Sequence, residues 1–232
     1  MDITSANSLL LANDTPRCNG MQELPSAADE RAKYREYCVQ QGGPLNGTAP
    51  ALSPTFYHIS HGLALTAGSA LGSTPPSTEA CLAAFVITNT AGLTAGARAW
   101  SKHAHRSQPE GQSPSEPEAM TAKKKLKAPE GWWGRPSGPV AGINEKALTL
   151  FWRIVNGATW RNLHWLPHEV LVYEMRVEEG YGMRWYQDQG RKAEGDVLIP
   201  VEDIPWTFRG FVEPMMENGH ELGWRHPLSG SS

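Results

Sequence analysis

Charged and aromatic side chains crowd together in FRGFVEPMMENGHELGWRH, the stretch from Phe208 to His226. It contains a carboxylate at Glu213 and an imidazole at His220, which are chemically able to act as a general acid–base pair. Their spacing does not by itself bring them together. We therefore take Glu213 and His220 as the catalytic candidates of a hydrolytic enzyme, assisted by a metal or not, which is one hypothesis for this chain.

Arginine and glutamate also alternate on two expected strands. Strand alternation places Glu174 and Arg176 on one face, and Arg209, Phe211 and Glu213 on another. If the two faces coincide, a row of paired charges suits a carboxylate, a phosphate or a peptide. The alternative is a solvent-facing sheet with cross-strand ion pairs. Because Trp and Arg are favoured at binding surfaces, the predicted ligand-binding residues are Glu174, Arg176, Arg184, Trp185, Arg209 and Trp224.

The histidines could instead bind a metal. His164 and His168 have the spacing that aligns two ligands on a helix, but Pro167 between them breaks such a helix. A nonhelical site needs the fold to bring several histidines together. The candidate ligands are His164, His168, His220 and His226. Since histidines near tryptophan are more often hydrogen-bonded structural residues, and no nucleotide-binding glycine loop is present, we expect no metal and no cofactor.

The composition limits the class of protein. The 232 residues carry a formal net charge of −3 and are 40% hydrophobic, which allows one core and a long tail. This balance argues against a polycation built for nucleic acid or membranes. The most apolar region, 62–86, is interrupted by Pro75, Pro76 and Glu79, so it is a poor membrane span. Three widely spaced cysteines are typical of free thiols. We expect a soluble protein of the cytoplasm or nucleus with no membrane partner.

The tryptophans divide the chain unevenly, because only Trp100 of the nine precedes residue 130. Large aromatic side chains dominate core energetics. We therefore predict a loosely ordered region with short helices at 1–105, a disordered Pro-rich linker at 106–130, and an α+β domain at 131–228. The linker contains a basic cluster, Lys123–Lys127, which is either a nuclear-import or phosphate-contacting segment or a solvated lysine run.

The fold class expected is α+β, with a small, mostly antiparallel sheet packed by one main helix. That helix is predicted to begin at Asn144, as N-cap, and to end at Gly157. The predicted strands cover 170–177, 183–186, 196–201 and 207–213. In the N-terminal region the sequence predicts a capped helix after Ser26, a strand or helix at 81–87, and a helix at 92–105.

Four motifs resemble those of an uncharacterised eukaryotic protein family: GWWG at 131–134, GYGxRW at 180–185, FRGFxEP at 208–214 and GHxxxWxH at 219–226. The resemblance covers roughly the last hundred residues. It implies no known activity.

Three hypotheses follow for the function. The first is a binding protein whose Arg/Glu/His/Trp-rich face takes an anionic small molecule or a peptide. The second is the hydrolytic enzyme described above. The third is a nuclear or nucleic-acid-associated module that contacts nucleic acid through its lysine cluster.

Overall fold

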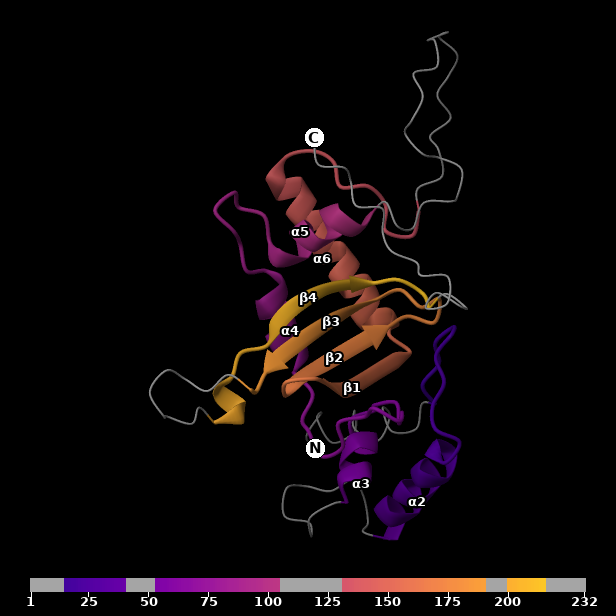
Figure 1. Ribbon diagram of the computed structural model, residues 1–232. Helices are drawn as coiled ribbons and strands as arrows, with labels where there is room; N and C mark the ends of the chain where they lie inside the picture. The colour runs from indigo at the N-terminus through magenta and orange to yellow at the C-terminus, as the bar shows by residue number, and fades with distance from the viewer. Residues whose placement is uncertain (1–14, 41–52, 105–130, 191–199, 216–232) are drawn as a thin grey trace, which may run out of the picture.

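The computed structural model describes residues 15–40, 53–104, 131–190 and 200–215 (Figure 1). The helices in these residues are α2 (Ala27–Gln40), α3 (Pro54–Ser60), α4 (Thr78–Phe85), α5 (Ala95–His103) and α6 (Val140–Gly157). The strands are β1 (Trp160–Leu166), β2 (Val170–Arg176), β3 (Gly182–Asp188) and β4 (Thr207–Val212), and a short 3-10 helix, η2, covers Val201–Asp203. The predicted α+β class is confirmed. None of the described helices is long and apolar enough to cross a membrane.

The four strands form one antiparallel sheet in the order β1-β2-β3-β4. Short returns of the chain join β1 to β2 and β2 to β3. The return from β2 to β3 needs Gly180, whose φ is 97°. A Cβ atom at this glycine would lie 2.9 Å from the backbone of Pro214. The turn is therefore packed against the segment that follows β4.

Helices α4, α5 and α6 cover one face of the sheet, and Figure 1 shows α6 crossing behind the strands. The core between them is aromatic. The ring of Phe85 on α4 lies 5.0 Å from Phe151 on α6 and 4.8 Å from Phe208 on β4. Trp185 on β3 lies 5.4 Å from Phe208 and is completely buried. These T-shaped and tilted contacts fix how the helices sit on the sheet.

Residues that precede position 105 and residues that follow position 130 pack in the same core. Trp100 on α5 donates its indole N–H to the carbonyl of Trp133 at 2.9 Å. Trp185 donates in the same way to the carbonyl of Cys81 on α4 at 3.0 Å. The sequence placed the packed domain from residue 131 onward, but Phe85 and Trp100 belong to the same core as the sheet.

A bulge in β4 changes the alternation expected there. The register shifts between Arg184 and its neighbour Trp185 on β3, and Gly210 opposite takes a φ of 139°. Phe208 and Phe211 both reach the core as a result, while Arg209 between them is exposed. The expectation that Arg209 and Phe211 share a face is wrong, because one extra residue in the bulge resets the two-residue period.

Two other expected boundaries differ. Helix α6 begins at Val140, after Pro139, so Asn144 lies inside the helix and does not cap it. The Asn144 side chain instead accepts from the backbone N–H of Thr94 at 3.1 Å and donates to the carbonyl of Gly92 at 2.9 Å. Strand β1 was not expected. Of the strand predicted at 196–201, residues 196–199 lie outside the described part, and Val201 opens η2.

The outer edge of β1 is lined by the segment that follows α3. Ala64 donates its backbone N–H to the carbonyl of Arg161 at 2.7 Å, and Ala70 donates to Leu163 at 2.7 Å. This segment is held in turn by Glu23, whose carboxylate accepts from the backbone of Leu65 at 2.7 Å. The N-terminal residues thus extend the sheet sideways at β1.

Candidate functional site

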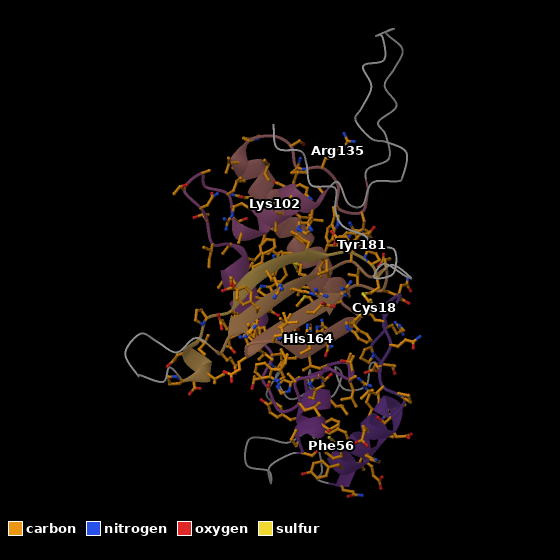
Figure 2. All side chains as sticks on the ribbon, in the orientation of Figure 1. Cys18, Phe56, Lys102, Arg135, His164 and Tyr181 are labelled. Atoms are coloured by element: carbon orange, nitrogen blue, oxygen red, sulfur yellow. The ribbon has the colours of Figure 1, made fainter. Side chains whose placement is uncertain are left out.

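The sheet face turned away from α4, α5 and α6 carries polar side chains where a second helical layer would pack. We call it the polar face and define it by Asn162, His164, Glu174, Arg176, Arg184 and Arg209. Figure 2 shows His164 in front of the strands, on the side away from α6. Strand alternation explains the arrangement, because Leu163, Tyr173 and Met183 point into the core from the same strands. The expectation that Glu174 and Arg176 share a face is confirmed.

Glu174 lies at the centre of the polar face. Its side chain is 2% exposed, and it pairs across the sheet with Arg184. Nε of Arg176 donates to Oε1 at 2.5 Å, and Nε of Arg184 donates to Oε2. Burial acts to raise the pKa of the Glu174 carboxyl, but the two guanidinium groups outweigh it and hold the pKa below its ordinary value. The carboxylate is therefore ionised at neutral pH and each oxygen binds one arginine.

Arg176 is a structural clamp. Besides its contact with Glu174, its Nη1 donates to the carbonyl of Gly180 at 2.5 Å and to the carbonyl of Glu213 at 2.7 Å. The side chain is 2% exposed. It joins β2 to its own turn and to the end of β4. Arg176 was predicted to bind ligand, but its burial and these three contacts commit it to the fold.

Arg184 and Arg209 are the cations of the polar face that reach solvent. The Arg184 side chain is 36% exposed, and Arg209 is exposed. Within the described part of the chain, the hydrogen bond of the Arg184 side chain to protein is made by Nε, to Glu174. Arg209 forms no ion pair within the same residues. Two accessible guanidinium groups on one face favour a phosphate or carboxylate ligand.

His164 lies on β1 within the electrostatic reach of these groups. Burial lowers the pKa of its imidazole most, Glu174 raises it, and Arg184 and Arg209 lower it again. The net effect is a pKa below the ordinary histidine value. His164 is therefore neutral at neutral pH, and a neutral imidazole can accept a proton.

Glu213 has a partner that the sequence did not suggest. Oε1 of Glu213 lies 3.1 Å from Nδ1 of His103 at the end of α5, and both side chains are about one-fifth exposed. Burial, followed by the charges of Glu213 and Glu179, raises the pKa of Tyr181 nearby. The sequence separation of 110 positions between His103 and Glu213 hid this pair from any argument based on spacing. The predicted partner, His220, lies outside the described residues.

The remaining predicted residues are placed as follows. Trp185 lies in the core with no exposed surface, so it does not reach a ligand on the polar face. His168 lies in the exposed turn between β1 and β2. Trp224, His226 and the lysine cluster Lys123–Lys127 lie outside the described residues. Across the described ranges no group of three or more His, Cys, Asp and Glu side chains is arranged to bind a metal.

Asn162 is a member of the polar face that the sequence did not suggest. Its side-chain amide donates to the hydroxyl of Thr66 at 3.2 Å, and its Oδ1 accepts from Ser69 at 3.3 Å. The residue is 6% exposed. It fixes the segment after α3 against β1. An isolated asparagine in the sequence carries no signal of such a contact.

The comparison with known families gives one match. A family described as the CdiA C-terminal tRNase toxin domain matches residues 118–192, about a third of the chain. Within the described residues this stretch contains α6, β1, β2 and β3, and so His164, Glu174 and Arg184. No curated protein and no solved structure matches the chain. The resemblance to a eukaryotic family stays a prediction. Over 118–192, the chain is similar to a tRNase toxin domain.

Proposed function

We propose that this chain is a ribonuclease that binds a phosphodiester of RNA on the polar face and cleaves it. One observation carries the proposal. The stretch similar to a tRNase toxin domain is the stretch whose strands bring His164, Glu174 and Arg184 to one face of the sheet. The name of the matched family gives tRNA as the substrate of that family. RNA is the substrate class we assign to this chain.

His164 supplies the base. Attack of a ribose 2′-oxygen on the adjacent phosphorus forms one P–O bond, breaks the bond to the 5′-oxygen and requires loss of the 2′-hydroxyl proton. The neutral imidazole of His164 accepts that proton, and a proton from water goes to the leaving 5′-oxygen. A positioned base contributes about 10²–10⁴-fold to such a rate.

Arg184 and Arg209 supply the charge. Negative charge builds on the phosphate oxygens as the 2′-oxygen attacks, and guanidinium groups already in place stabilise it without reorganisation. Glu174 does not take part in proton transfer, because both of its oxygens hold arginines. It is a positioning residue for Arg184. The charged and titratable groups of the polar face therefore separate into one base, two accessible cations and one buried carboxylate.

The test is a cleavage assay with purified chain and a mixture of tRNAs. We expect wild-type protein to cut RNA, and Arg184→Ala and Arg209→Ala to lower the rate by about 10²–10³-fold if each stabilises the transition state. Arg35→Ala on exposed α2 is the matched control and should cleave as wild type does. Salt-dependent RNA binding without cleavage would instead favour the binding hypothesis. If the wild-type protein neither binds nor cleaves RNA, the proposal is overturned.

A further inference from the structure

A small pocket lies beside the start of β1, outside the polar face. Residues 15–17 form one wall, Gly62 contributes to another, and residues 158–161 complete it. Its volume is about 120 Å³. Pockets for drug-sized ligands begin at about 300 Å³, so this one suits a small ion and its water and excludes a nucleoside.

The two charged residues that line the pocket are both arginines. Arg17 and Arg161 line it from two segments far apart in the sequence, and no carboxylate is among the described residues that line it. The nearest acidic partner is Glu178, whose Oε1 lies 3.9 Å from Nε of Arg17. Both of these side chains are more than half exposed, so this ion pair holds Arg17 only weakly.

The backbone under Arg17 is fixed in place. Arg17 donates its backbone N–H to the carbonyl of Thr159 at 2.9 Å, and the Thr159 hydroxyl donates to the carbonyl of Arg17 at 2.6 Å. Two hydrogen bonds to one residue set the position from which the Arg17 side chain extends. The pocket is therefore preorganised on one side, which reduces the entropy lost when a ligand binds.

Arg161 provides the second fixed cation. Its Nη1 donates to the carbonyl of Ala158 at 3.3 Å and its Nη2 to the carbonyl of Val155 at 3.5 Å, at the C-terminal end of α6. The guanidinium offsets the negative end of the helix dipole there. Arg161 also forms a side-chain hydrogen bond with Tyr173. An arginine has five N–H donors, so these three contacts leave others for an anion.

The pocket is connected to the polar face through β1. Thr159 donates its backbone N–H to the carbonyl of Arg176 at 3.0 Å. Cys18, next to Arg17, packs with Trp160 at the start of β1. The pocket therefore lies at the β1 end of the sheet that carries Arg184 and Arg209 on β3 and β4.

We propose that the Arg17–Arg161 pocket binds one phosphate group of the RNA, as a second contact beside the polar face. That the phosphate belongs to RNA rests on the proposed function. Binding of an anion in the pocket does not depend on it. Two cations with a small volume and no carboxylate suit a phosphate oxygen cluster rather than a base. The contact would position the strand and carry no sequence information.

Inorganic phosphate tests the pocket without any RNA chemistry. Thermal unfolding is measured in phosphate and in chloride at equal ionic strength, for wild type, Arg17→Ala and the control Arg35→Ala. We expect phosphate to raise the Tm of wild type and of Arg35→Ala, and to raise the Tm of Arg17→Ala by less, because the polar face of that variant still binds phosphate. Arg17 is exposed, so its removal should leave the fold intact, whereas Arg161→Gln also removes the hydrogen bonds to the carbonyls of Ala158 and Val155. An equal response of wild type and Arg17→Ala overturns the pocket.

Binding of 2′-O-methyl RNA, which has no 2′-hydroxyl to attack, tests the source of the phosphate. We expect the slope of log K against log salt concentration to fall in Arg17→Ala by about 0.7–0.9, the value for one phosphate contact. Arg35→Ala should keep the wild-type slope. An unchanged slope in Arg17→Ala, with a reduced phosphate response, overturns the RNA assignment and leaves a site for free phosphate. Failure of wild type to cleave RNA, with both Arg17 effects present, refutes the proposed function alone.

Discussion

At the scale of single residues, Glu174 organises the polar face. It is buried, ionised and shared by Arg176 and Arg184. A buried charge is costly to remove from water, and its partners become uncompensated if it is lost. The same carboxylate therefore serves stability, through the clamp at Arg176, and the proposed chemistry, through the position of Arg184.

Replacing Glu174 measures how much its buried ion pairs stabilise the fold, compared with an exposed ion pair. Glu174→Gln keeps the shape but leaves two arginines with a neutral partner, and we expect a loss of about 3–5 kcal/mol in the free energy of unfolding. Urea denaturation measures it. Glu30→Gln, which removes an exposed i,i+3 pair with Lys33, is the control and should cost less than about 1 kcal/mol. A similar small loss for Glu174→Gln would mean that the buried network does not support the fold.

His164 gives the proposed reaction a defined pH dependence. The folded protein holds the pKa of His164 below its ordinary value, and only the neutral imidazole accepts a proton. The midpoint of the fall in cleavage rate at acid pH should therefore lie below the ordinary pKa of histidine. Arg184→Gln removes a charge that lowers this pKa, so the fall should move to higher pH in that variant. A kcat/KM profile with the same midpoint in both proteins would rule out His164 as the base.

At the scale of elements, the bulge in β4 decides which of its side chains lie on the polar face. Gly210 has a φ of 139° and open space around its Cα, so any side chain there is opposed by backbone strain and not by a clash. Gly210→Val should destabilise the protein by about 1–3 kcal/mol. Gly68→Ala is the control, because that glycine has open space and no such φ. Equal Tm values for the two variants would show that the bulge is not required.

Sequence patterns predicted β2, β3 and β4 because their apolar and β-branched residues alternate clearly. They did not predict β1, because the WRNLHWL sequence places Asn162 and His164 on a face that is polar yet largely covered. Trp165 on the same strand is 43% exposed, which blurs the alternation further. The Glu174–Arg176 pair was predictable from local alternation, whereas Glu213 and His103 meet only through the packing of α5 beside β4.

At the scale of the whole molecule, the helices before residue 105 complete the core of the sheet that follows. The sequence hid this, because the contributing residues are mostly small: Ala70, Ala84, Ala97 and Gly96. Small size is what allows close approach. A Cβ atom at Gly96 would lie 1.9 Å from the ring of Phe85. Judged by composition, the residues before 105 contain few large core side chains. Their small side chains instead pack closely around aromatic rings.

A fragment tests how far the two halves depend on each other. Residues 106–232 alone lack Phe85 and Trp100, and Trp185 loses the carbonyl of Cys81 that accepts its N–H. We expect this fragment to show no cooperative thermal unfolding, whereas the full chain does. Near-UV circular dichroism during heating measures the difference. A fragment that unfolds cooperatively near the Tm of the full chain would contradict a shared core.

The most direct test of RNA cleavage with His164 as the base compares single-turnover cleavage of end-labelled tRNA by the wild-type chain and by His164→Ala at neutral pH. We predict cleavage by wild type and a rate at least about 100-fold lower for His164→Ala, with both proteins unfolding at a similar temperature. Equal rates for the two proteins, or intact RNA with folded wild-type protein, would contradict the account.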